Sequence, residues 1–270
     1  GIITAKEKLR ALLGAGLTIN GLNTKCFSSE KANSATLETN GIDNVERWLN
    51  MSIPDVYSSE LSEFVFASGL KLLEEWFPDV MYLSTTDYIQ HKYAPEDKEA
   101  IKFLTMVDNY LSEISKFDVT IVITADHGMS AKHNKNGDPQ IVFIQDFLDE
   151  EFGTNSTNVI LPITDPYVVH HGALGSYATI YFNEKRIYNE AFSKLKSLKG
   201  IDQICSKDEA VKRFDLPSDR IGDIVITSSE KITLGKTKSY HDLKSLKEPL
   251  RSHGGLSEQK VPFIVNKPIN

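Results

Sequence analysis

Five side chains of the kind that bind divalent metal ions stand in three short segments of this 270-residue chain. Asp126 and His127 are adjacent, and they directly follow a strongly apolar run at residues 119–124. Charged side chains are seldom fully buried unless they are paired or bound to a metal. In open α/β sheets, ligands bind beyond the carboxyl ends of the strands. An acid and a histidine at the end of an apolar strand therefore indicate a metal or catalytic site.

Two further segments repeat this chemistry. Asp87 and His91 follow the apolar run 80–84, and their i,i+4 spacing places both side chains on one face of a helical turn. His253 lies in a Ser-His-Gly-Gly sequence shortly before another apolar run, residues 261–265. Together the segments offer two carboxylates and three imidazoles. This donor set suits zinc and, less specifically, manganese or iron.

Helical patterns separate the apolar runs that must position these side chains. Apolar residues recur at helical spacing over residues 59–77, and Pro78 ends the pattern. Pro95 opens a second long helix, which we expect to reach about Lys116. The resulting β-α-β order favours a parallel sheet with right-handed crossovers. The expected inner stripe of the second helix is Ile101, Leu104, Val107, Leu111 and Ile114.

The start of the chain predicts one more helix. Thr4-Ala-Lys-Glu7 has the form of a capping box, in which a threonine and a glutamate three residues later bond each other's backbone. Gly14 and Gly16 are expected to end this helix.

After His127 the pattern changes to short strands and helices joined by polar loops. Such a pattern is typical of an α+β insert and not of a continuing parallel sheet. The apolar run at 261–265 then returns to the core. We therefore expect residues 1–130 and 215–270 to form an α/β metal-binding core, and residues 131–214 to form an inserted cap.

The composition argues against several kinds of partner. A net charge of −7 does not fit a nucleic-acid surface, which needs a basic patch. No segment approaches the roughly 20 apolar residues that span a bilayer, so no membrane is expected. Cys26 and Cys205 lack the paired spacing of a metal or redox motif. We expect two buried thiols in a reducing compartment, the cytoplasm.

The order of these motifs resembles the alkaline phosphatase superfamily, and most closely its branch of nucleotide pyrophosphatases and phosphonoacetate hydrolases. The superfamily motifs are Asp87-x-x-x-His91, Asp126-His127-Gly-Met and His253-Gly-Gly, and the closer likeness lies in residues 4–10, 26–32 and 170–176.

The resemblance implies an alkaline-phosphatase-like core with a mostly parallel sheet between helices, plus the inserted cap. It also implies two zinc ions. One ion would be held by Asp87, His91 and His253, and the other by Asp126 and His127. In that family the second ion also takes an earlier Asp and a nucleophilic Thr, which we expect upstream of Gly1 in a longer polypeptide.

The resemblance assigns Lys6 and Lys8 to binding the substrate. Lysines in the first turn of a helix oppose the helix dipole, which favours anions there, so an anion docked between them would explain their position. A solvated helix face is the alternative for both.

The implied activity is metal-dependent hydrolysis of the P–C bond of phosphonoacetate to acetate and phosphate. Two alternatives remain open: a phosphodiesterase or nucleotide pyrophosphatase of the same superfamily, and a non-catalytic fragment that keeps one metal site. The implied partner is a small phosphonate substrate, with neither nucleic acid nor membrane, and relatives imply a homodimer.

Overall fold

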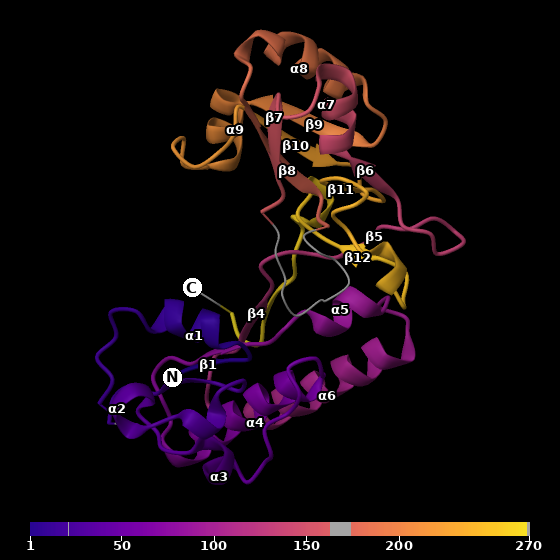
Figure 1. The fold of residues 1–270 in the computed structure, drawn as a ribbon. Coiled ribbons are helices and arrows are strands. Elements are labelled where there is room, and N and C mark those ends of the chain that lie inside the picture. The colour runs from indigo at the N-terminus through magenta and orange to yellow at the C-terminus, as the bar shows by residue number, and fades with distance from the viewer. Residues whose placement is uncertain (21, 163–173, 269–270) are drawn as a thin grey trace. The chain divides into compact units, whose positions relative to one another are not determined.

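The chain divides into two compact units in the computed structural model, which describes residues 1–20, 22–162 and 174–268 (Figure 1). The first unit comprises residues 1–121 and 265–270, and the second comprises residues 122–264. The chain therefore passes from one unit to the other twice, once at each end of the second unit.

A three-stranded parallel sheet lies at the centre of the first unit. Its strands are β1 (Ile2–Thr4), β2 (Cys26–Ser28) and β3 (Tyr82–Ser84), in the order β2-β1-β3. Ile3 of the middle strand stands opposite Phe27 on one side and opposite Leu83 on the other. The sheet is parallel, but it is not the one predicted from the β-α-β order, because residues 122–124 of the later apolar run pair with residues 263–265 and not with β3.

The helices of the first unit surround this sheet. They are η1 (Ala32–Ser34), α1 (Glu7–Gly14), α2 (Leu37–Asn40), α3 (Val45–Leu49), α4 (Glu60–Glu75), α5 (Tyr88–Lys92) and α6 (Lys98–Ile114). Helix α4 contacts β1, β3 and α6, while α1 contacts β1 and β2. The apolar core they enclose includes Ile3, Phe27, Leu61, Phe64, Val65 and Leu72.

Helix α1 begins later than predicted, and the expected capping box is wrong. Thr4 is the last residue of β1, and its Oγ1 donates to the carbonyl oxygen of Lys6 at 2.7 Å. The sheet holds the backbone of Thr4 extended, so the helix starts at Glu7. The predicted end of the helix is confirmed, because α1 stops at Gly14.

The predicted inner stripe of α6 is wrong at its first two residues and confirmed at Ile114, which is buried. Ile101 and Leu104 are 52% and 54% exposed, whereas Ala100 and Phe103 are buried. Ala100 and Phe103 pack with Ile89 of α5. At the start of α6, contact with α5 therefore buries Ala100 and Phe103 in place of Ile101 and Leu104.

A four-stranded antiparallel sheet, in the order β7-β8-β10-β9, dominates the second unit (Figure 1). Helix α7 contacts β7, α8 contacts β9, and α9 contacts β9 and β10. The core beneath them includes Leu148, Ile180, Leu195 and Ile224. The strands are β7 (Thr157–Ile160), β8 (Tyr177–Phe182), β9 (Ile201–Ser206) and β10 (Ile224–Ser228), and the helices are α7 (Ile144–Phe152), η2 (Lys185–Ile187), α8 (Tyr188–Ser197) and α9 (Lys207–Phe214).

Three short strand pairs carry the segments of interest. β5 (Ser130–Ala131) pairs with β12 (Arg251–Ser252), and β6 (Ile141–Phe143) pairs with β11 (Thr233–Gly235). β4 (Val122–Thr124) pairs with β13 (Phe263–Val265). The remaining elements are the short helices η3 (Leu243–Ser245) and η4 (Leu256–Glu258).

The fold class is α/β, as predicted, with a parallel sheet in one unit and an α+β arrangement in the other. The predicted boundaries of core and cap stay a prediction, because the packing of segments does not report which of them was inserted. No helix in the described ranges is long and apolar enough to cross a membrane.

Candidate metal centre

Asp87 and His91 are the candidate metal ligands of the first unit. Asp87 occupies the N-cap position of α5, directly after β3, and His91 lies one turn later. The Nε2 atom of His91 is 3.0 Å from Oδ2 of Asp87. The prediction that both side chains share one face of a helical turn is therefore confirmed.

Packing fixes the short helix that carries this pair. Ile89 is buried against Ala100 and Phe103 of α6, and the amide of Thr86 donates to the hydroxyl of Ser62 on α4. His91 is only 4% exposed, whereas the side chain of Asp87 keeps 35% of its surface exposed. The imidazole is thus held by the fold, and the carboxylate retains access to solvent.

Asp126 and His127 follow β4 in the second unit and differ strongly in exposure. The side chain of Asp126 is 89% exposed and that of His127 is 25% exposed. Nδ1 of His127 lies 2.9 Å from the carbonyl oxygen of Gly128. A carbonyl oxygen only accepts, so Nδ1 carries the hydrogen and Nε2 presents its lone pair. This is the tautomer that a metal-binding histidine needs.

His253 lies against His127. The two rings are stacked, with centroids 3.7 Å apart and planes inclined by 6°. Pairing of β12 with β5 places Ser252 opposite Ser130, so the residues flanking this pair meet. The amide of Ser176 donates to the carbonyl oxygen of His253 at 2.8 Å and fixes the loop from the other side. Within the second unit, the structure therefore gathers Asp126, His127 and His253.

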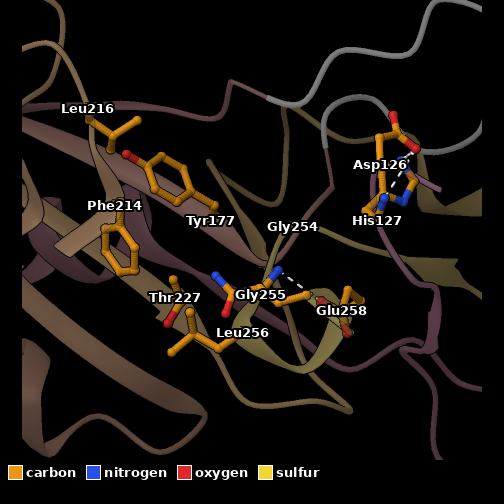
Figure 2. A pocket seen from close by; sticks show the side chains of 11 residues that line it. Asp126, His127, Tyr177, Phe214, Leu216, Thr227, Gly254, Gly255, Leu256 and Glu258 are labelled. Carbon is orange, nitrogen blue, oxygen red and sulfur yellow. Dashed lines mark hydrogen bonds and ion pairs between the residues drawn. The ribbon is translucent and has the colours of Figure 1, made fainter. Parts of the chain in front are cut away.

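A cavity of about 230 Å³ in the second unit adjoins Asp126 and His127 (Figure 2). One wall is apolar and aromatic, formed by Tyr177, Phe214 and Leu216. Burial raises the pKa of Tyr177 to about 12, so its hydroxyl stays protonated at neutral pH. Tyr177 thus adds no charge to this wall of the cavity. Its other lining residues are Thr227, Gly254, Gly255, Leu256, Glu258 and Gln259.

Lys6 and Lys8 flank the start of α1 in the first unit. Lys6 is the N-cap residue and its Nζ lies 3.4 Å from the carbonyl oxygen of Val56, while Lys8 is exposed in the first turn. Their role in binding a substrate stays a prediction. His170 and His171, which belong to a motif of the resemblance, lie outside the described residues.

Two buried charged residues near the site were not predicted from the sequence. Lys132 and Glu258 are 0% and 2% exposed and form an ion pair of 3.1 Å. They are 126 positions apart in the chain, and neither stands in a recognisable motif. A charged residue that follows an apolar strand would have been the only local hint, and many surface residues share it.

The donor atoms in each unit fit a divalent metal ion. The first unit supplies one carboxylate and one imidazole, and the second supplies one carboxylate and two imidazoles. Oxygen and imidazole nitrogen are common ligands of zinc, and a zinc site takes about four ligands. Asp126 and His127 alone therefore make an incomplete shell.

Comparison with known proteins identifies the family. Residues 16–256 match the model of the type I phosphodiesterase / nucleotide pyrophosphatase family. The chain belongs to this family, which is part of the alkaline phosphatase superfamily, and the resemblance inferred from the motifs is confirmed.

Phosphonoacetate hydrolase from Sinorhizobium meliloti 1021 is a much closer match. Its crystal structure in complex with phosphonoacetate is 56% identical over 98% of this chain, with a TM-score of 0.94. Its complex with phosphonoformate matches equally well. The chain spans 64% of that protein, less than two thirds of its length.

A distant relative shows the same fold. Murine ectonucleotide pyrophosphatase / phosphodiesterase 5 is 19% identical, with a TM-score of 0.51, over 78% of this chain and 52% of that one. Together with the closer match, it confirms the alkaline-phosphatase-like α/β fold.

Proposed function

We propose that this chain is the metal-binding part of a phosphonoacetate hydrolase, which cleaves phosphonoacetate to acetate and phosphate. The observation that carries the proposal is 56% identity, over 98% of the chain, to a phosphonoacetate hydrolase whose structure contains phosphonoacetate. A phosphonate is then the small-molecule partner. The family assignment alone supports only a hydrolase of phosphate esters or related compounds.

In this proposal two zinc ions are bound, and manganese or iron would use the same donors. Asp87, His91 and His253 hold one ion, and Asp126 and His127 hold the other. The chemistry of the donor atoms and the tautomer of His127 support the assignment. Two donors fall short of the four that zinc takes, so an additional Asp and the nucleophilic Thr would come from residues outside this sequence.

The reaction breaks a P–C bond, and its leaving group is a carbanion. The adjacent carboxylate of phosphonoacetate can accept those electrons as an enolate-like species. Bound divalent ions would neutralise phosphonate oxygens and lower the pKa of the attacking hydroxyl. Gly128 would keep His127 in its metal-binding tautomer, and Lys6 and Lys8 would hold the substrate carboxylate by charge.

A phosphodiesterase or nucleotide pyrophosphatase activity is the second candidate, and the cavity favours it. Phosphonoacetate is small and doubly anionic, whereas Tyr177, Phe214 and Leu216 form an apolar wall in the cavity that Asp126 also lines. Such a wall suits the larger organic group of a phosphodiester.

Turnover of two substrates separates these activities. The complete polypeptide, loaded with zinc, would be assayed for phosphate release from phosphonoacetate and for hydrolysis of a nitrophenyl phosphodiester. We expect faster turnover of the phosphonate, and its loss after treatment with a chelator. Weak phosphonate turnover beside strong diester turnover would refute the first proposal, and no turnover of either would favour a non-catalytic metal-binding protein.

A cytoplasmic location and a homodimer complete the proposal. Cys26 and Cys205 are both buried and unbridged, which suits a reducing compartment.

A further inference from the structure

Glu258 contacts both loops that carry histidines in the second unit. Its carbonyl oxygen accepts from the amide of Gly128, the residue after His127, at 2.6 Å. Its carboxylate Oε2 accepts from the amide of Gly255, two residues after His253, at 2.8 Å. A single residue thus bonds to the backbone beside each of two imidazoles that lie 3.7 Å apart.

Lys132 balances the buried charge of this residue. Its Nζ donates to Oε1 of Glu258 at 3.1 Å and to the carbonyl oxygen of Glu230 at 2.6 Å. The hydroxyl of Ser257 also donates to Oε1, at 2.6 Å. Lys132 follows β5, so the ion pair ties the segment after His127 to helix η4. The carboxylate is therefore held in one place by donors from several segments.

Glycine at positions 128 and 255 allows both loops to approach Glu258 and its neighbours closely. A Cβ atom on Gly255 would lie 2.9 Å from Cβ of Ser176 and 3.0 Å from Oε2 of Glu258. A Cβ atom on Gly128 would lie 3.3 Å from the carbonyl oxygen of Glu258. A side chain at either position would therefore press on Glu258 or its neighbours, and because Glu258 accepts from the amides of both glycines, a displacement of Glu258 would act on both loops.

We propose that Glu258, with its charge balanced by Lys132, is a positioning residue that sets the separation of the His127 and His253 rings. Because the proposed function assigns these histidines to different metal ions, the inference rests on that function for its catalytic meaning: Glu258 would fix the spacing of the two ions. Metal-binding residues depend on such supporting contacts, whose loss typically costs about 10- to 100-fold in metal affinity.

Two double variants isolate the contact from Glu258 to Gly255. Lys132→Met with Glu258→Gln removes both charges but keeps an amide oxygen that can accept from Gly255. Lys132→Met with Glu258→Met has a similar volume and removes that acceptor. Neither leaves a buried charge unpaired. Leu148→Ala, in the core of the same unit, is the control for a general loss of stability.

Two measurements are made on the 270-residue chain. The first is the proton chemical shift of each ring of His127 and His253 in metal-free protein, assigned with His127→Gln and His253→Gln. The second is the zinc dissociation constant. We expect the Gln-containing double variant to keep both ring shifts and to bind zinc within about twofold of the wild type. In the Met-containing double variant we expect the ring protons to lose the chemical-shift changes that stacking causes. We also expect this variant to bind zinc about 10-fold or more weakly than the wild type.

Equal ring shifts and equal zinc affinity in the two double variants would overturn the inference. It would also be overturned if Leu148→Ala lost the ring shifts and the zinc affinity to the same extent as the Met-containing double variant. If the Met-containing variant does not fold, Glu258→Asp, which withdraws the carboxylate from Gly255 but keeps its charge, replaces it under the same criteria. A wild-type chain that binds no zinc would contradict the proposed metal centre, while the ring shifts of the metal-free protein would still decide whether Glu258 positions the histidines.

Discussion

The ion pair between Lys132 and Glu258 makes a quantitative prediction about stability. Both side chains are almost fully enclosed, with 0% and 1% of their surface exposed. Lys132→Met keeps the length of the side chain but removes its charge. The carboxylate of Glu258 is then left buried without its cation, although the donors Gly255 and Ser257 remain.

Removing one partner of a buried ion pair costs about 3–5 kcal/mol, because an uncompensated charge stays inside. The carbonyl oxygen of Glu230 also loses its donor, which adds about 1 kcal/mol. We therefore expect Lys132→Met to lower the free energy of unfolding of the second unit by about 4–6 kcal/mol. Adding Glu258→Gln should recover most of this loss, because the double variant buries no charge.

The destabilisation caused by Lys132→Met should become smaller as the pH falls. Burial alone would raise the pKa of Glu258, but hydrogen bonds from Ser130 and Ser257 and the charge of Lys132 hold it below its usual value. In the wild type, the stability that ionised Glu258 contributes is thus complete above the unfolded-state pKa of about 4.3. This stability is lost as the pH falls through the lower pKa of the folded state. In Lys132→Met burial dominates, the folded pKa rises, and acid relieves the penalty. The difference in unfolding free energy between the wild type and Lys132→Met should therefore become smaller as the pH is lowered from about 7 to about 4.5.

Hydrogen exchange in metal-free protein measures the loss of stability in the second unit itself. Mass spectrometry of peptides from β8 and β10 reports the opening of the second unit separately from the first. The reasoning fails if Lys132→Met shifts the opening free energy by less than about 1 kcal/mol, far below the cost of an unpaired buried charge. It also fails if the double variant is less stable than the single one, or if the penalty grows in acid.

Three further predictions concern the metal centre. Asp126→Ala should lower the zinc content by elemental analysis, yet change the unfolding free energy of the metal-free protein by no more than about 0.5 kcal/mol, because the side chain is 89% exposed; unchanged zinc content would contradict its assignment as a ligand. Gly255→Ala should destabilise the second unit by about 1–3 kcal/mol, since its Cβ would lie 2.9 Å from Cβ of Ser176; an unchanged urea midpoint would show that the loop can shift. Zinc at about 100 times its dissociation constant should add about 2.7 kcal/mol to stability, and a melting temperature that a chelator leaves unchanged would refute binding to the folded state.

Four of the five candidate ligands could be predicted because they are local features. Asp87 and His91 follow a strand and share one helical turn, and Asp126 and His127 directly follow another strand. Ligands beyond the ends of strands follow from such patterns without knowledge of contacts. The patterns did not predict that β4 pairs with β13 and not with the parallel sheet. His253 could be chosen only through the resemblance, since a histidine before two glycines is also an ordinary turn.

Contacts between distant segments explain what the sequence did not predict. At the start of α6, Ala100 and Phe103 are buried in place of Ile101 and Leu104 because α5 docks on them. The capping box at Thr4 did not form because β1 held that residue extended. Lys132 and Glu258 meet across 126 positions of chain, a distance at which neither helical nor strand periodicity carries information.

The two ligands of the adjacent acid–histidine pair are prepared for metal binding to different degrees. His127 is fixed by Gly128, by its stack on His253 and, through Gly128, by Glu258, so its orientation exists before an ion arrives. Asp126 is 89% exposed and gains most of its order from the ion itself. Fixed imidazoles favour a metal site by reducing the entropy lost on binding, whereas a loosely held carboxylate adds charge that can adapt to the ligands around it. Such a centre therefore depends on its supporting residues as well as on its ligands, and those residues are the ones that local sequence patterns do not reveal.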